Sequence, residues 1–217
     1  MSASALSIAG PRRHRRGPQT AAEAARGRAR RWAIASLALA ALAAIALFWL
    51  LVRPVALQPT PLGLNYIEAT PRLGTAGMPD RHQFRAIAHA GYRAVINLAP
   101  ADALGSHADE AARVAAEGMA YAHVPVDFAH PTPADYTRFV AQLRQHGEAR
   151  VLVHCQLGLR ASVFVYLYRV LELGEDPDRA WEAVERVWQP SHQWRALVRT
   201  LHAARGRPLP FAFDAAP

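Results

Sequence analysis

The residues of this chain that could do chemistry gather in residues 149–162, which read Ala-Arg-Val-Leu-Val-His-Cys-Gln-Leu-Gly-Leu-Arg-Ala-Ser. A short apolar run before Cys155 is typical of a buried strand, and the apolar stretch from Arg160 onward is typical of a buried helix. Between them lies Gly158, a residue typical of tight turns. Backbone N–H groups of such a loop and of a helix N-terminus bind phosphate oxygens. The pattern therefore predicts an anion cradle with Cys155, the one cysteine of the chain, at its base.

The same segment predicts a nucleophile and its anion-binding partners. The helix N-terminus and the guanidinium of Arg160 favour the thiolate form of Cys155 at neutral pH. A planar guanidinium also contacts two phosphate oxygens at once, so we expect Arg160 to bind the phosphate. His154 precedes the nucleophile and faces the other side of its strand, where we expect it to hold the loop through a hydrogen bond. The predicted phosphate-binding residues are Gln156, Leu157, Gly158, Leu159 and Arg160.

Attack of a thiolate on a phosphate ester needs a proton donor for the leaving group, and two aspartates could supply it. Asp135 lies three residues after Thr132, a spacing typical of a helix-capping box. Asp127 directly follows a predicted strand, in the loop Asp-Phe-Ala-His-Pro, and has no such capping role. We therefore predict Asp127 as the general acid and Asp135 as a capping residue.

The loop resembles that of a known superfamily. His154 and Cys155, followed by a glycine-containing loop, Arg160 and Ser162, are similar to the phosphate loop of cysteine-dependent phosphatases of the dual-specificity and tyrosine type, in particular their bacterial phosphatase-like group. Further matches are Gly-Thr-Ala-Gly-Met-Pro at 74–79, Ala-Val-Ile-Asn-Leu at 94–98 and Val-Pro-Val-Asp at 124–127. The resemblance covers residues 64–187.

The resemblance implies a phosphatase that works without a cofactor or metal through a phosphocysteine intermediate. Its substrate would be a phosphorylated protein, a small phosphoester or a lipid head-group phosphate. It further implies that Ser162 supports the thiolate as the family's hydroxyl does. The position of Asp127, 28 residues before the cysteine, also resembles the family's acid loop.

Two other functions stay open on the sequence. Four residues separate Cys155 from Arg160, where the phosphatases usually have five, and Ala161 stands where they have Ser or Thr. A four-residue gap also occurs in rhodanese-type sulfurtransferases, in which Cys155 would carry a persulfide. A non-catalytic phosphate-binding domain is the third possibility.

The charge of the chain is concentrated in its N-terminal part. All 25 basic residues are arginine, and eight lie in residues 1–31 against one acid, Glu23. The remaining 186 residues carry 17 arginines and 16 acids, so most of the net charge of +8 comes from the N-terminal residues 1–31. We therefore expect no nucleic-acid partner. The ten histidines show no metal-ligand spacing, and no cofactor is expected.

Residues 32–52 form an uncharged, apolar stretch long enough to cross a bilayer. No small-x-small cleavage pattern follows it, so we expect an uncleaved transmembrane anchor. The arginines before this segment predict a cytoplasmic N-terminus and an outward-facing domain. The expected localisation is a single-pass inner-membrane protein with a periplasmic catalytic domain.

Strand and helix patterns alternate after residue 64, which predicts an α/β fold with a largely parallel central sheet flanked by helices. A second capping box is expected at 106–109, Ser-His-Ala-Asp. The expected organisation is a basic tail (1–31), a transmembrane anchor (32–52), a Pro-rich linker (53–63), a catalytic domain (64–205) and a C-terminal tail (206–217).

Overall fold

The computed structural model describes residues 26, 30–32, 34, 39–43 and 58–213. The chain divides into two compact units, Met1–Pro54 and Val55–Pro217. Most of the predicted transmembrane segment, residues 32–52, lies outside the described residues. Among the residues that are described, no helix is both long and apolar enough to span a membrane.

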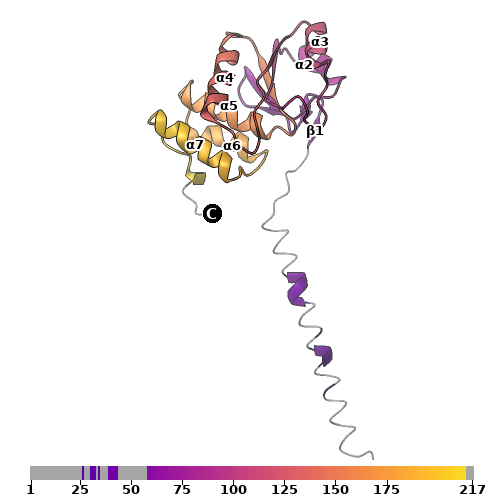
Figure 1. Cartoon of the computed structure of the whole chain (residues 1–217), viewed down its shortest axis with the longest axis vertical. Coiled ribbons are helices and arrows are strands. Elements are labelled where there is room, and N and C mark those ends of the chain that lie inside the picture. The colour runs from indigo at the N-terminus through magenta and orange to yellow at the C-terminus, as the bar shows by residue number, and fades with distance from the viewer. Residues whose placement is uncertain (1–25, 27–29, 33, 35–38, 44–57, 214–217) are drawn as a thin grey trace, which may run out of the picture. The chain divides into compact units, whose positions relative to one another are not determined.

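The second unit is built on a five-stranded mixed sheet (Figure 1). Its strands are β3 (Ile67–Glu68), β4 (Leu73–Ala76), β5 (Ala94–Asn97), β6 (Ala120–His123) and β7 (Val151–His154), in the order β3-β4-β7-β5-β6. β4, β7, β5 and β6 run parallel, whereas β3 pairs antiparallel with β4. The predicted α/β fold with a largely parallel sheet is confirmed, and β7 lies at its centre.

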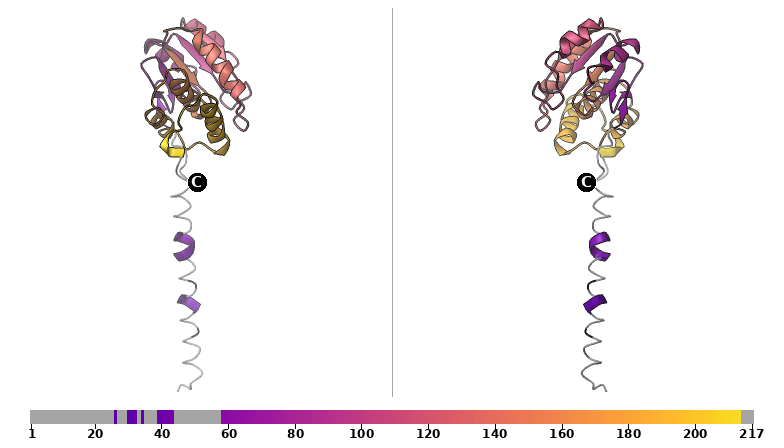
Figure 2. Two further views of the ribbon diagram at one scale, coloured as in Figure 1. Left: turned by 90° about the vertical axis from the view of Figure 1, so that its left-hand side faces the viewer. Right: turned by 90° about the vertical axis from the view of Figure 1, so that its right-hand side faces the viewer.

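Helices cover both faces of the sheet (Figures 1 and 2). One face packs on α2 (Gln83–His89) and α3 (Glu110–Ala116), and the other on α4 (Pro133–Arg144), α5 (Leu159–Leu171), α6 (Pro177–Glu185) and α7 (His192–Ala204). Successive side chains of a strand point to opposite faces. Accordingly Leu152 joins the core under α2 and α3, whereas Val151 and Val153 join the core under α4 to α7. Because both faces of β7 are buried, its sequence is a continuous apolar run.

The helix starts match the predicted caps in part. Thr132 caps α4, and its capping box with Asp135 is present, so the predicted role of Asp135 is confirmed. The box predicted at 106–109 is wrong, because α3 begins at Glu110 after Asp109 with no side-chain cap. The Ser106 hydroxyl instead donates to the carbonyl of Pro100 at 3.2 Å.

Both ends of the described domain extend beyond the predicted boundaries of 64 and 205. Residues 59–63, expected in the linker, form with Leu64 a two-stranded antiparallel sheet of β1 (Pro59–Thr60) and β2 (Gly63–Leu64). At the other end, the short 3-10 helix η1 (Phe211–Phe213) places Phe213 against Trp181 and under the guanidinium of Arg195. Segments that the sequence assigns to a linker and a tail therefore pack on the domain.

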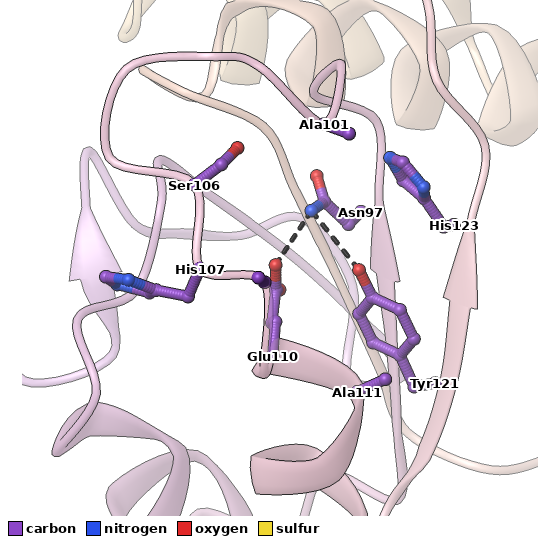
Figure 3. Close-up of a pocket in the computed structure, with 9 residues that line it drawn as sticks. Asn97, Ala101, Ser106, His107, Glu110, Ala111, Tyr121 and His123 are labelled. Carbon is purple, nitrogen blue, oxygen red and sulfur yellow. Dashed lines mark hydrogen bonds between the residues drawn. The ribbon is translucent and has the colours of Figure 1, made fainter.

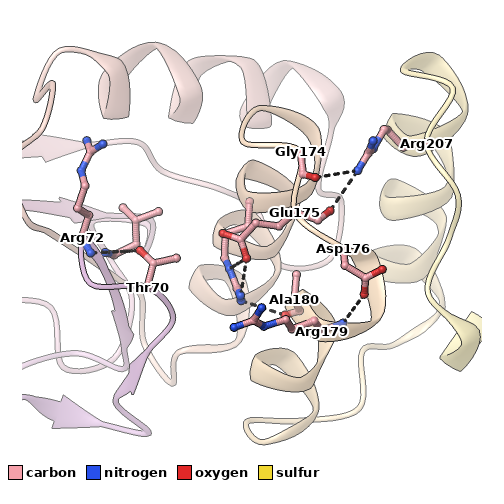
Figure 4. A network of polar contacts seen from close by, with 10 residues as sticks. Thr70, Arg72, Gly174, Glu175, Asp176, Arg179, Ala180 and Arg207 are labelled. Carbon is pink, nitrogen blue, oxygen red and sulfur yellow. Dashed lines mark hydrogen bonds and ion pairs between the residues drawn. The ribbon is translucent and has the colours of Figure 1, made fainter.

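A polar network fixes the C-terminal end of α5 (Figure 4). Arg169, 6% exposed, pairs with the carboxylate of Glu175 at 2.8 Å and donates to the carbonyl of Ala180 at 3.2 Å. Arg207 donates to the carbonyls of Gly174 and Glu175. The buried charge of Arg169 is thus fully partnered, and α5 is tied to α6 and to the segment after α7.

Candidate active site

The loop between β7 and α5 has the geometry of an anion cradle. It follows the carboxyl end of the central strand, and α5 begins at Leu159 with Gly158 as its N-cap. Gly158 has φ +86°, and a Cβ there would lie 3.3 Å from the backbone of Ala76 and Gly77. Both the left-handed conformation and the close approach require glycine. The predicted turn role of Gly158 is therefore supported by its surroundings.

Neighbouring segments hold the loop from outside. Met78 N–H donates to the carbonyl of Gln156 at 3.0 Å, and the Asn65 side chain donates to the carbonyl of Leu157 at 3.0 Å. In the described part of the chain, no hydrogen-bond acceptor is found for the backbone N–H groups of Gln156, Leu157, Leu159 and Arg160. The loop carbonyls are engaged while these donors remain available, as an anion site needs.

Arg160 is a buried cation with no counter-ion in the described part of the chain. It is 7% exposed, and among the described residues no carboxylate lies within ion-pair distance of its guanidinium. Within the part of the chain that the structure describes, its Nε atom has no hydrogen-bond partner, and the guanidinium carbon lies 5.2 Å from the ring centroid of Phe128. The second buried arginine of the same helix, Arg169, has a full set of partners. A buried, unpaired cation is costly, so the arrangement favours an anionic ligand at Arg160.

Cys155 and Arg160 share one cavity. The cavity has a volume of about 230 Å³ and is lined by Phe128, Cys155, Gln156, Leu157, Leu159 and Arg160. Cys155 is a buried free thiol, and its backbone N–H donates to the carbonyl of Ala76 at 3.2 Å. The structure thus brings the predicted nucleophile and the predicted phosphate ligands into one site.

The predicted acid, Asp127, lies beside this cavity and does not line it. Its side chain is 61% exposed and accepts hydrogen bonds from the His130 ring at 2.9 Å and from the Ala129 N–H at 2.8 Å. The hydrogen bond from His130, followed by that from the Ala129 backbone, holds the pKa of Asp127 below its usual value. The next residue, Phe128, does line the cavity. Asp127 therefore directly precedes a residue that lines the cavity, and its lowered pKa favours the ionised carboxylate.

Two tryptophans that no sequence pattern singled out, Trp188 and Trp194, hold the Asp127 loop in place. The Trp194 indole N–H donates to the carbonyl of Phe128 at 3.0 Å. The Phe128 ring lies 5.7 Å from Trp194 and 5.6 Å from Trp188 between ring centroids. Phe128 therefore links α7 to the cavity wall and to Arg160. Nothing in the local sequence signals this contact, because Phe128 and Trp194 are 66 residues apart.

Ser162 differs from the role that the resemblance implied. Its hydroxyl donates to the carbonyl of Leu159 at 2.9 Å and accepts from the Trp188 indole N–H at 3.2 Å. A hydroxyl has one proton, so Ser162 does not donate to the thiolate in this arrangement. The shift by one position relative to the family pattern turns Ser162 toward the helix backbone.

The His154 side chain, predicted to hold the loop through a hydrogen bond, bonds instead to Glu110 at the start of α3. The His154 Nε2 and a Glu110 carboxylate oxygen are 2.6 Å apart, and both side chains are buried. Glu110 also accepts from the Asn97 amide at 2.8 Å, and the Tyr121 hydroxyl lies 3.3 Å from the same amide nitrogen (Figure 3). Asn97, Glu110 and Tyr121 line a second cavity of about 200 Å³. No three His, Cys, Asp or Glu side chains in the described residues are grouped to hold a metal ion.

Comparisons with known proteins agree with this geometry. Residues 65–171 match the family model for the phosphatase-like domain of beta-lactamase hydrolase-like protein. The beta-lactamase hydrolase-like protein of Xylella fastidiosa (strain Temecula1 / ATCC 700964) is 34% identical over 113 residues, which are 50% of this chain and 26% of that protein. The chain thus spans about a quarter of the length of this curated relative.

Solved structures share the fold. The DUF442 protein of Shewanella putrefaciens CN-32 is 35% identical, with a TM-score of 0.60 over 65% of this chain and 93% of that one. TpbA of P. aeruginosa, solved in complex with pTyr, is 19% identical, with a TM-score of 0.54 over 72% of this chain and 99% of that one. At the latter identity the likeness shows the fold alone.

Proposed function

Because the chain belongs to the cysteine-dependent phosphatase superfamily, in the family of the Shewanella DUF442 protein, we propose that it hydrolyses phosphate monoesters through a phosphocysteine intermediate on Cys155. The observation that carries this proposal is the buried guanidinium of Arg160, which has no ion-pair partner among the described residues and lies in the cavity of the only cysteine. A phosphate dianion there would accept from Arg160 and from the open loop N–H groups, and would compensate the buried charge.

The chemistry follows from this placement. The Cys155 thiolate attacks phosphorus, the S–P bond forms and the bond to the leaving oxygen breaks. Asp127 supplies the proton to that oxygen. Water then attacks the phosphocysteine, which releases inorganic phosphate and restores the thiolate. Because the contacts of Asp127 hold its pKa below the usual value, the dianionic substrate must raise that pKa before Asp127 can act as the acid.

We assign the protein to the inner membrane, held by residues 32–52, with a cytoplasmic N-terminus and a periplasmic domain. The support is the arginine asymmetry and the uncharged stretch of the sequence. Substrates at that location would be exported phosphotyrosine proteins, small phosphoesters or lipid head-group phosphates. An alkaline phosphatase fused after Pro217 should then be active and a green fluorescent protein fused there dark. The opposite pattern would place the domain in the cytoplasm.

Activity is tested with the full chain in detergent, on para-nitrophenyl phosphate and in parallel for transfer of sulfur from thiosulfate to cyanide. We expect phosphate release that is lost in Arg160→Ala. The control Arg85→Ala removes a charge from an exposed side chain and should keep full activity. Sulfur transfer without phosphate release would overturn the proposal in favour of a sulfurtransferase. Phosphate binding without either activity would favour a non-catalytic binding domain.

A further inference from the structure

The second cavity lies at the carboxyl end of the sheet, between β5 and β6 (Figure 3). Asn97, the last residue of β5, and His123, the last residue of β6, both line it. The chain leaves β5 toward α3 on one face of the sheet and leaves β6 toward α4 on the other face. In open α/β sheets, ligands bind in crevices where neighbouring strands lead to opposite faces. The topology therefore indicates a ligand site here that is separate from the one at Cys155.

The cavity has small side chains at its rim and a buried acid at its floor. Ala101, Ala108 and Ala111 line it and are exposed, whereas Glu110 is 3% exposed. Its volume of about 200 Å³ has room for about six water molecules, or for a ligand of similar size. A small molecule could therefore enter from solvent and reach the Glu110 carboxylate.

Two polar residues of the cavity wall have no side-chain proton left for a ligand. The Asn97 amide donates to Glu110 at 2.8 Å and to the Tyr121 hydroxyl at 3.3 Å, which uses both of its protons. The Ser106 hydroxyl donates its one proton to the carbonyl of Pro100 at 3.2 Å. The lone pairs of the Ser106 oxygen can still accept hydrogen bonds from a ligand.

Two further residues of the wall add acceptors. The His123 Nε2 lies 2.7 Å from the Ala99 carbonyl, and because a carbonyl only accepts, the Nδ1 of the neutral ring is left as an acceptor. Each oxygen of the Glu110 carboxylate has one partner in the described part of the chain, His154 Nε2 at 2.6 Å and the Asn97 amide at 2.8 Å. A carboxylate oxygen can accept two hydrogen bonds, so both oxygens can bind a further donor.

The charge of the lining points the same way. Glu110 is the one acid among the described residues that line the cavity, and none of the 25 arginines of the chain is among them. Burial, and then the neighbouring Glu110, raises the pKa of Tyr121 to about 12, so its hydroxyl keeps its proton. The His107 ring points away from the other polar side chains in Figure 3. The group that best complements this lining is a positively charged hydrogen-bond donor.

We propose that this cavity binds a small primary amine in its ammonium form. The three N–H donors of an ammonium group complement the acceptors of Glu110, Ser106 and His123, and the carboxylate makes the bond charge-assisted. A phosphate or carboxylate ligand would meet Glu110 with no arginine to receive it. The two cavities therefore select ligands of opposite charge. The proposal concerns binding alone and goes beyond the proposed phosphatase activity.

Three probes test which property of the ligand matters. Ethanolamine has an ammonium group, ethylene glycol has the same size without charge, and choline has the charge without N–H donors. Binding is followed by thermal unfolding of the full chain in detergent, at neutral pH and constant ionic strength. Ethanolamine at a hundred times its dissociation constant should raise the unfolding temperature by about 5 °C or more. Ethylene glycol and choline should bind about tenfold more weakly or not at all.

Ala111→Leu tests where the amine binds, and Ala112→Leu is its matched control. Both alanines are exposed residues of α3, and of the two only Ala111 lines the cavity. Leucine is a strong helix former, so we expect both variants to fold. Ala111→Leu fills the cavity and should abolish the shift caused by ethanolamine. Ala112→Leu should keep that shift in full.

Glu110→Gln tests the role of the charge, because it keeps the size of the side chain. It should weaken ethanolamine binding about 10- to 100-fold. The proposal would be overturned by the absence of a saturable shift in the unmodified chain, by an equal shift in Ala111→Leu, or by choline binding as tightly as ethanolamine. Should Glu110→Gln fail to fold, the two alanine variants decide alone. The measurement needs no turnover, so failure of the phosphatase assay would not affect it.

Discussion

Replacing Arg160 with methionine should make the protein more stable while it abolishes phosphate binding. Arg160 is 7% exposed, and its guanidinium has no carboxylate partner among the described residues. Burial of an unpaired ion costs several kcal/mol even after relaxation. The cation–π contact between the guanidinium and the Phe128 ring offsets about 2 kcal/mol of this burial cost. Methionine fills a similar volume without charge, so Arg160→Met should raise the free energy of unfolding by about 2 kcal/mol.

The assay is urea unfolding of the full chain, followed by tryptophan fluorescence, with and without inorganic phosphate. Phosphate at a hundred times its dissociation constant should stabilise the unmodified protein by about 2.7 kcal/mol and should leave Arg160→Met unchanged. The two proteins should therefore exchange their order of stability when phosphate is added.

Arg169→Met is the control on the same helix. Arg169 is 6% exposed but paired with Glu175, so its loss leaves a carboxylate without a partner and should destabilise the fold. If Arg160→Met were destabilised in the same way without phosphate, or were stabilised by phosphate as much as the unmodified chain, the description of Arg160 as an anion ligand would be refuted.

Four further variants test other parts of the site and fold. Asp127→Asn should slow the hydrolysis of esters with poor leaving groups by about 10² to 10⁴, and that of esters with good leaving groups much less. Asp135→Asn should instead lower the stability of the protein by about 0.5 to 2 kcal/mol. The reverse pattern would assign the general acid to Asp135. His130→Ala removes the hydrogen bond that lowers the pKa of Asp127, so the alkaline limb of the kcat/KM profile should move to higher pH, and an unmoved limb would contradict that contact. Burial lowers the pKa of His202; the unfolded chain then binds more protons, and the free energy of unfolding should fall as the pH drops below about 6.5. In urea titrations at about pH 7.5 and 5.5, His202→Gln should show a smaller fall, and an equal fall would assign it to other groups.

The sequence predicted the site where its signal is local. A strand, a left-handed glycine and a helix start occur within ten residues of each other, so the residue pattern alone locates the loop around Cys155. The capping box of Thr132 and Asp135 is equally local. This separation of a capping aspartate from a loop aspartate is what singled out Asp127.

The sequence could not reveal contacts between distant segments. Trp194 and Phe128 meet only because α7 packs near the loop that follows β6. In the sequence, Glu110 resembles an ordinary solvent-exposed residue at the start of a helix. The pairing of β5 with β7 places Asn97 beside His154, and the buried Glu110 carboxylate bonds to both side chains. The Ser106 pattern fitted a capping box by spacing alone, whereas its hydroxyl bonds within the preceding loop.

The central claim is that Cys155 carries the phosphoryl group during turnover. The most direct measurement is mass spectrometry of the full chain, quenched in acid during hydrolysis of para-nitrophenyl phosphate and digested. We predict one phosphoryl group on the peptide that contains Cys155, and neither adduct nor turnover in Cys155→Ser. Continued phosphate release by Cys155→Ser, or turnover by the unmodified chain without a phosphorylated cysteine, would contradict the mechanism.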